Sequence, residues 1–201
     1  MRSRLYKNIS LVAWLLFGLL WTNVAFATVL NVPQKYQEKA NWCWAATSQA
    51  ILEYYTTVKT QTEIAQYGTE GVNTWNWLSG SSPHTSTDPL RNGIDLILQH
   101  FGGLATTQWG WVLSQTQVQS EIAARRPFVI YWQWDRGGGH FVVAKGIDGD
   151  YVTRMDPASG TTLNKYSWVR QGSSHTWVDT LTLKTSPPAD ITAIIGLMLS
   201  D

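Results

Sequence analysis

The amino-acid pattern changes at Pro127, and this change limits the fold that the chain can adopt. Before Pro127, apolar residues recur at helical spacing, whereas after it they gather in short runs separated by turn residues. Glycine occurs in each of these turns, at residues 137–139, 148–150 and 159–160. We therefore expect an α+β fold with helices first and an antiparallel sheet second. The expected strands are Phe128–Trp132, Phe141–Gly146, Tyr151–Met155 and Thr176–Leu183.

The part of the chain before Pro127 predicts three helices and a long loop. Asn41 is a good N-cap, and residues that favour helix follow it up to about Tyr55. Pro89 suits the first turn of a second helix, which two glycines after Phe101 terminate. Residues 68–89 are rich in Gly, Ser, Asn and Thr, so we expect a loop there. The expected helices are Asn41–Tyr55, Asp88–Phe101 and Thr116–Arg125.

The first residues are typical of a secretory signal peptide. Basic residues precede the apolar stretch Ile9–Trp21, which is short for a membrane span. Ala25–Ala27 then fits the small-x-small cleavage rule, with the cut before Thr28. We expect an exported protein, periplasmic or secreted, without a stable membrane span after cleavage; an uncleaved anchor is the alternative. The expected organisation is a signal peptide over 1–27, a domain over 28–185, and a C-terminal tail over 186–201 that packs on the domain.

Composition excludes several classes of function. The chain has 15 Lys and Arg against 14 Asp and Glu, with no basic run, so we expect no nucleic-acid partner. A single cysteine excludes a disulfide framework within the chain and a cysteine-rich zinc site. Motifs for a metal, a calcium loop or a phosphate loop do not occur in the sequence. We therefore expect no metal and no cofactor, and we expect a monomer.

The single cysteine, Cys43, lies between two tryptophans, Trp42 and Trp44. If Asn41 caps the helix, Cys43 is in its first turn, where the partial positive charge of the helix N-terminus stabilises a thiolate. Exported proteins usually pair their thiols, so an unpaired one is either inert in a core or retained for its reactivity. Both possibilities, a nucleophile and a buried thiol, remain open at this point.

One histidine and one aspartate are placed to act with the thiol. His140 follows three glycines, which allow close backbone approach, and it precedes an expected strand, so its ring can face a cleft. If the strands before and after residues 148–150 form a hairpin, Asp156 reaches the same end and can orient the imidazole. A sheet-edge histidine and a plain turn at Asp156 are the alternatives. We expect the remaining histidines in loops or at a helix end; they are His84, His100 and His175.

Gln37 is a candidate for stabilising negative charge. It precedes Cys43 by six residues, and its side-chain amide can donate to the oxyanion that forms when sulfur attacks a carbonyl. The backbone N–H of Cys43 is the second expected donor.

Taken in order, these segments resemble the papain-like cysteine peptidases. The similarity is to the bacterial branch with the peptidase domains of bacteriocin exporters and the effector proteases of plant pathogens. Papain has Asn as its third catalytic residue, and the Asp of this chain matches the bacterial branch. Within Val32–Leu183, the segments are Gln37-x5-Cys43-Trp44-Ala45, Arg126-Pro127-Phe128-Val129-Ile130, Gly138-Gly139-His140-Phe141-Val142-Val143 and Asp156-Pro157.

The resemblance implies a cleft between a helical half and a sheet half, with a peptide or protein as substrate. It implies that Cys43 is the nucleophile and His140 the base and acid. It further implies that Asp156 orients the imidazole and that Gln37 donates to the oxyanion. The segment between the expected cut and Cys43 is too short for a papain-type inhibitory propeptide.

The expected reaction is hydrolysis of a peptide bond through a thioacyl-enzyme intermediate. An amine in place of water would make the same site a transpeptidase or amide ligase. A catalytically silent, Trp-rich module that holds peptide or glycan is the third possibility.

Tryptophans recur in pairs two residues apart, which share a face in a strand. Such a pair could form a binding platform, but we expect most of these rings in the core. The pair around Cys43 is an exception, because at least one ring should line the site. The expected substrate-binding residues are Trp42, Trp44, Gly138 and Gly139; the other pairs are 75/77, 109/111 and 132/134.

Overall fold

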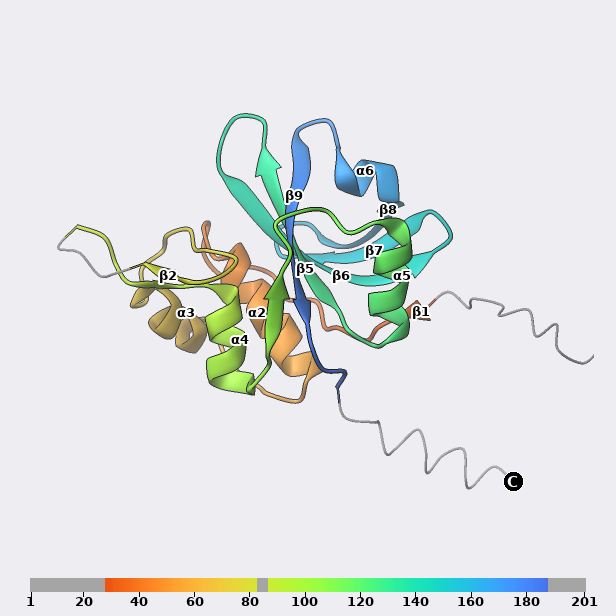
Figure 1. Ribbon diagram of the computed structural model, residues 1–201. Helices are drawn as coiled ribbons and strands as arrows, with labels where there is room; N and C mark the ends of the chain where they lie inside the picture. The colour runs from red at the N-terminus through yellow and green to blue at the C-terminus, as the bar shows by residue number, and fades with distance from the viewer. Residues whose placement is uncertain (1–27, 83–86, 188–201) are drawn as a thin grey trace, which may run out of the picture.

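The computed structural model describes residues 28–82 and 87–187 (Figure 1). The expected signal peptide and nearly all of the expected C-terminal tail lie outside the described residues. Helices gather in the first part of the chain and strands in the second, which confirms the expected α+β class.

The helical half is built around α2 (Cys43–Tyr54). Two further helices pack against α2, and a short hairpin lies beside them (Figure 1). On its other side α2 contacts the sheet, where Thr47 Oγ1 donates to the carbonyl of Phe141 at 3.2 Å. The first residue of α2 therefore lies where the two halves meet. The other elements of this half are α3 (Gln61–Thr69), β2 (Ser81–Ser82), β3 (Arg91–Asn92) and α4 (Ile94–Gly102).

The second half is a seven-stranded sheet with antiparallel pairing throughout, in the order β4-β9-β5-β6-β7-β8, with β1 paired to β6. β6 is the longest strand and pairs with β5 and β7. The strands are β1 (Thr28–Val29), β4 (Thr106–Gln108), β5 (Phe128–Trp134), β6 (Gly139–Asp148), β7 (Tyr151–Asp156), β8 (Gly160–Lys165) and β9 (His175–Leu183). The helices α5 (Gln115–Ala123) and α6 (Tyr166–Arg170) pack against this sheet.

The four expected strands are confirmed, and so is the hairpin of β6 and β7. Val143 pairs with Met155, and the turn at Gly149 has the positive φ that favours glycine. This register brings the first residues of β6 and the last residues of β7 to one edge of the sheet.

The expected N-cap of the first helix is wrong. α2 begins at Cys43, and its N-cap is Trp42, which makes no capping hydrogen bond with its side chain. The backbone N–H of Asn41 donates instead to Asn73 Oδ1 at 3.1 Å, and the Asn41 side chain donates to the Asn73 carbonyl at 3.2 Å. A tertiary contact has replaced the local cap, and Cys43 still lies in the first turn.

The second expected helix begins later than the sequence predicts. Gly93 is the N-cap of α4, so Asp88 and Pro89 lie outside the helix. The two residues before Gly93 pair with β2 instead, which stops a helix from starting at Pro89. The expected loop over 68–89 is also interrupted, because α3 reaches Thr69 and β2 lies within the range.

Besides the two-residue strands β1, β2 and β3, four elements were not expected from the sequence: α3, β4, β8 and α6. For α3 the sequence does contain a signal. Thr60 accepts from the backbone N–H of Glu63, and the Glu63 carboxylate accepts from the backbone N–H of Thr60, which is a capping box.

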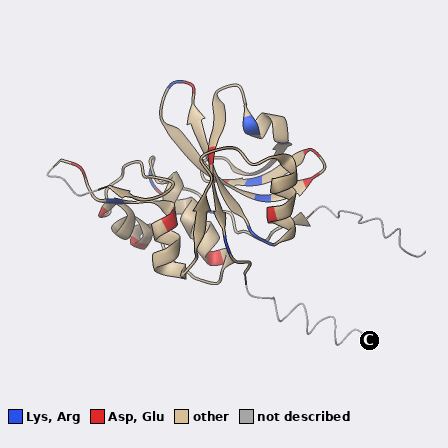
Figure 2. Ribbon diagram, in the orientation of Figure 1, with Lys and Arg blue, Asp and Glu red and all other residues tan. Residues whose placement is uncertain are grey.

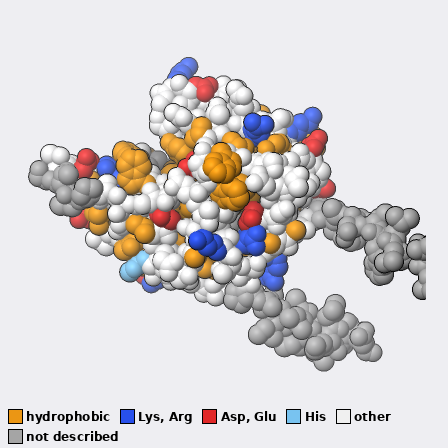
Figure 3. All heavy atoms as spheres, viewed as in Figure 1, with side chains coloured by type: hydrophobic (Ala, Val, Ile, Leu, Met, Phe, Trp, Pro, Cys, Tyr) orange, Lys and Arg blue, Asp and Glu red, His pale blue; other side chains and the backbone are white. Residues whose placement is uncertain are grey.

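Charged residues of both signs are scattered over the two halves (Figure 2). Figure 3 shows hydrophobic side chains in several separate groups between them on the face in view. Within residues 28–82 and 87–187, none of the helices has the length and apolar character needed to cross a bilayer.

Candidate active site

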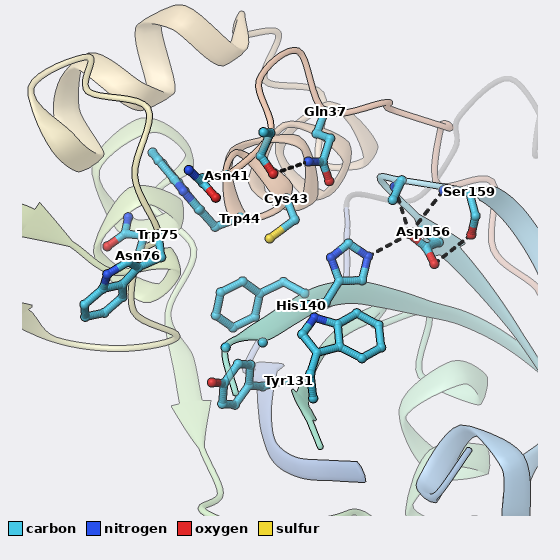
Figure 4. A pocket seen from close by; sticks show the side chains of 16 residues that line it. Gln37, Asn41, Cys43, Trp44, Trp75, Asn76, Tyr131, His140, Asp156 and Ser159 are labelled. Carbon is cyan, nitrogen blue, oxygen red and sulfur yellow. Dashed lines mark hydrogen bonds and ion pairs between the residues drawn. The ribbon is translucent and has the colours of Figure 1, made fainter. Parts of the chain in front are cut away.

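A cavity of about 780 Å³ opens between α2 and the edge where β6 begins and β7 ends (Figure 4). Cys43, His140, Asp156 and Gln37 all line it, although they come from distant parts of the sequence. The other lining residues are Ala40, Asn41, Trp44, Trp75, Asn76, Tyr131, Trp134, Gly138, Gly139, Phe141, Ala158 and Ser159. Within the described part of the chain, no cluster of His, Cys, Asp and Glu could hold a metal ion.

Cys43 is half-buried and is the first residue of α2. Backbone N–H groups in the first turn of a helix have no partner inside the helix, and they carry partial positive charge. The sulfur lies in the cavity near the ring of His140 (Figure 4). This position suits both a thiolate and an oxyanion formed beside it.

His140 and Asp156 form a buried pair at the end of the β6–β7 hairpin. Nε2 of His140 lies 2.7 Å from Oδ1 of Asp156, and the two residues are only 7% and 5% exposed. Because Nε2 is used by Asp156, Nδ1 is the ring nitrogen that faces Cys43 (Figure 4). The hydrogen bond therefore selects the orientation that a general base for Cys43 needs.

Asp156 is held by three further groups that sequence reasoning missed. Arg154 Nη1 lies 2.9 Å from Oδ2, and the Ser159 hydroxyl donates to the same oxygen at 2.8 Å. The backbone N–H of Ala158 donates to Oδ1 at 2.8 Å. Two signals were available. Residues two apart on a strand share a face, and an Asp before a turn commonly accepts from the N–H two residues on.

The charges of the pair stabilise each other. Burial by itself lowers the pKa of His140, but the hydrogen bond and charge of Asp156 and the adjacent Cys43 outweigh it, so the pKa rises to about 9. Burial by itself raises the pKa of Asp156, but His140, Ala158 and Ser159 lower it well below its ordinary value. Imidazolium and carboxylate are therefore both charged at neutral pH.

Aromatic rings shield this pair from water. Trp134 stacks on His140, with ring centroids 5.8 Å apart and planes 22° apart. The guanidinium of Arg154 lies 4.7 Å from the ring centre of Trp132 and 5.3 Å from that of Trp168. Arg154 is only 4% exposed. A cation enclosed in this way is held in place by rings on two sides and by Asp156.

Gln37 lies at the cavity, but its amide is already used. Its Nε2 donates to the carbonyl of Lys39 at 3.0 Å and to that of Ala40 at 2.7 Å. Its backbone N–H donates to the Pro157 carbonyl at 3.0 Å, which ties Gln37 to the end of β7 next to Asp156. For Gln37 to hold an oxyanion, its side chain must release one of these carbonyl groups.

The expected substrate-binding residues divide into two groups. Trp44, Gly138 and Gly139 line the cavity. Trp42 does not line it; it is buried, and its indole N–H donates to the carbonyl of Val72 at 3.3 Å.

Of the other described histidines, neither His100 nor His175 lines the cavity. His100 stacks on Tyr67 at 4.0 Å, and His84 lies outside the described residues. His175, expected in a loop, is instead the buried first residue of β9 and stacks on Trp132 at 4.0 Å.

Comparison with known proteins gives a family match. The model of the Peptidase_C39 like family matches residues 29–182. No curated protein sequence matches the chain.

Solved structures share the fold. A protein of Bacillus anthracis assigned as a C39-like peptidase has a TM-score of 0.52 and 15% identity, covering 80% of this chain and 98% of that one. The peptidase domain of Streptococcus ComA, a bi-functional ABC transporter involved in quorum sensing, has a TM-score of 0.53 and 15% identity, covering 78% and 98%. A double glycine motif protease from an AMS/PCAT transporter, in complex with its leader peptide, has a TM-score of 0.50 and 19% identity, covering 79% and 95%.

We expect the charged pair to make stability depend on pH between about 6.5, the pKa of a free histidine, and about 9. A pKa raised by folding gives stabilisation that is complete below the unfolded value and is lost as the pH rises through the folded value. His140→Gln has no ring charge to lose. The free energy of unfolding from urea titrations should therefore differ most between the two proteins near about pH 6 and least near about pH 10. A difference that stays constant over this range would contradict the charged pair.

We expect Arg154 to hold Asp156 in position. We also expect its positive charge to lower the pKa of His140. In Arg154→Met, the imidazolium no longer shares the carboxylate with a guanidinium, so the pKa of His140 should rise, measured by NMR titration of the ring. The matched control is Arg126→Met, which removes another ion-paired arginine, bonded to Glu121 at 2.8 Å. Both variants should lose stability, but only Arg154→Met should shift the His140 titration. An unchanged titration would reduce Arg154 to a packing role.

Proposed function

The chain belongs to the peptidase C39-like family, and on that basis we propose that it is an exported cysteine peptidase that hydrolyses peptide bonds. The proposal depends on one observation, which is that a thiol, an imidazole and a carboxylate lie next to one another in this order across the cleft. Cys43 at the start of α2 faces Nδ1 of His140, whose Nε2 is bonded to Asp156 at 2.7 Å. This arrangement supports a nucleophile, a base and a group that orients the base.

The reaction begins with the sulfur. The thiolate of Cys43 attacks the peptide carbonyl carbon, and the charge that develops on oxygen lies at the N-terminus of α2. Gln37 joins this site by turning its amide away from the Ala40 carbonyl. A donor of this type contributes roughly 2.7–4 kcal/mol to the transition state.

His140 supplies and then recovers the proton. As the C–N bond breaks, the imidazolium gives its proton to the leaving amine, and a thioester to Cys43 remains. The neutral ring then takes a proton from water, which attacks the thioester carbonyl and releases the carboxylic acid and the thiolate. Asp156 stays ionised throughout and stabilises the imidazolium in both steps.

Water as the second nucleophile is the simplest interpretation of the site, since Cys43 is only half-buried and lines the cavity. A transpeptidase or amide ligase would use the same residues with an amine in place of water. The mass of the products formed with and without an added amine separates the two reactions.

Cys43→Ala should reduce peptide hydrolysis by roughly 10³-fold or more, because the remaining groups have no nucleophile to assist. The measurement is digestion of a peptide library, read by mass spectrometry, beside the wild type. Cys43 is the only cysteine, so alkylation by iodoacetamide reports this site alone, and His140→Ala should slow it. Turnover retained in pure Cys43→Ala protein would contradict the proposal. A wild type that binds peptides but never cleaves them would identify a silent relative.

Export is the second part of the proposal and is supported by the basic start, the apolar stretch and Ala25–Ala27. Thr28 and Val29 already pair with Ile147 and Gly146 of β6, so a cut before Thr28 leaves the sheet complete. The protein recovered from the periplasm or medium should have the mass of a chain that begins at Thr28. An uncleaved chain retained in the membrane would contradict this part.

A further inference from the structure

His175 is a buried titratable residue that takes no part in the proposed reaction. It is the first residue of β9, it pairs with Trp134 of β5, and it is only 2% exposed. It does not line the cavity that contains Cys43. Because burial penalises the charged form of an imidazole, the charge of this ring and the packing around it depend on each other.

Three indole rings surround His175, and we call them the three-indole cluster. The ring of Trp132 stacks on His175, with centroids 4.0 Å apart and planes 28° apart. Trp168 packs edge-on at 4.8 Å and 74°, and Trp134 packs edge-on at 6.0 Å and 86°. His175 lies against all three rings and therefore joins them.

The three-indole cluster also borders the catalytic pair. One of its rings, Trp134, stacks on His140, and the other two lie beside the guanidinium of Arg154. Arg154 in turn lies 2.9 Å from Oδ2 of Asp156. His175 is therefore one indole ring away from the base and from the cation that holds Asp156.

The backbone fixes the position of the His175 ring. Nε2 lies 3.2 Å from the carbonyl of Trp168, so in the neutral ring Nε2 carries the hydrogen and donates it. The backbone N–H of Gly172 donates to the His175 carbonyl at 3.0 Å. A Cβ atom at Gly172 would lie 2.7 Å from Nδ1 of the ring, so glycine leaves the space that the imidazole fills.

A proton on His175 would place a second positive charge beside Arg154. Of the charges near the ring, those of Arg154 and Asp135 act on it, with opposite signs. The titratable groups on the elements around His175 are Tyr131 on β5, Asp135 and Arg136 after β5, His140 on β6, Arg154 on β7, Tyr166 and Arg170 on α6, and Asp179 on β9 itself.

The surroundings favour the neutral ring. Burial lowers the pKa of His175 and the charge of Arg154 adds to this effect, whereas the carbonyl groups of Trp168 and Val169 and the charge of Asp135 offset part of it. The pKa is therefore below that of a free histidine. Arg154 is itself poorly supplied with partners, because its buried Nε has no hydrogen-bond partner among the described residues. A second buried cation at this place would be costly.

We propose that His175 is a positioning residue for the catalytic pair and a pH switch. The neutral imidazole holds the three-indole cluster around Arg154 and His140, and a proton on His175 opens the cluster and leaves Cys43 without its activating partner. Water then reaches Asp156 and His140, which weakens the charged contacts that burial had strengthened. The consequence for turnover rests on the proposed peptidase function, to which this inference adds a means of regulation.

The first test follows alkylation of Cys43 by iodoacetamide as the pH is lowered from about 8 to about 4. NMR titration gives the midpoint of the His175 ring, and each alkylation rate is divided by the rate of the same protein at about pH 8. His175→Gln can still donate to the Trp168 carbonyl but takes up no proton. One pH unit below the midpoint, about nine tenths of the wild-type rings are charged, so the wild type should retain about tenfold less of its rate than His175→Gln.

The matched control for the alkylation test is His100→Gln. His100 is an exposed histidine that stacks on Tyr67 and does not line the cavity. This variant should lose its alkylation rate in acid at the same pH as the wild type.

The second test measures stability and needs no reaction. The pKa of His175 is lower in the folded chain, so the unfolded chain binds more protons between the folded value and about 6.5. The free energy of unfolding of the wild type, from urea titrations, should therefore fall relative to that of His175→Gln as the pH drops through this interval. The difference between the two proteins should be constant above about pH 6.5 and below the NMR midpoint.

The outcomes separate the pH switch from the peptidase. The same loss of alkylation in acid for His175→Gln and the wild type, or a loss in His175→Gln that is equal at every pH, would overturn the switch. A stability difference that does not change with pH would also overturn it. Peptide hydrolysis by the wild type would stand in each of these cases. Loss in acid that depends on His175, in a protein that cleaves no peptide, would support the switch and overturn the peptidase.

Discussion

The carboxylate of Asp156 is the group on which the rest of the site depends. It is almost fully buried, and a buried carboxylate is tolerated only where hydrogen bonds and opposite charge replace its water. Arg154 lies on the same strand and Ala158 in the turn after it, whereas His140 comes from β6 and meets Asp156 only if the hairpin has the observed register. A shift of one residue would turn His140 to the face of the sheet opposite to Asp156. The hydrogen bonds that orient His140 therefore also fix the edge of the sheet.

The helical half brings Cys43 to this edge through two hydrogen bonds. Thr47 of α2 bonds to the backbone of β6 one residue beyond His140, which sets the helix against that strand. Gln37, just before α2, bonds to the carbonyl of Pro157, which follows Asp156 directly. Both halves are thus joined by hydrogen bonds that lie beside the proposed catalytic residues. The sulfur and the imidazole face each other because these neighbours are bonded.

What the sequence predicts well is local or follows from strand pairing. The turn around Gly149 implies the hairpin, and the hairpin implies that His140 and Asp156 meet. The failures come from contacts between distant residues. Asn41 has the right chemistry for an N-cap, but its amide bonds to Asn73, and Pro89 suits a helix start, but the residues after it pair with β2. Arg154 could have been anticipated from its spacing to Asp156, whereas nothing in the sequence indicates that Trp75 faces the cleft.

The tryptophans illustrate why spacing alone does not assign a role. Trp132 and Trp134 lie on one strand and share a face, and together they cover Arg154 and His140, where excluding water strengthens the charged contacts. Trp75 and Trp77 have the same spacing but lie in a loop, and both are substantially exposed, so the general expectation of core burial is wrong for them. The strand buries Trp132 and half-buries Trp134, whereas Arg91 and Trp77 hold Trp75 in place without covering it. A ring that is fixed yet left open to solvent at the cavity adds little to the core, so the same spacing leads to two different packing outcomes.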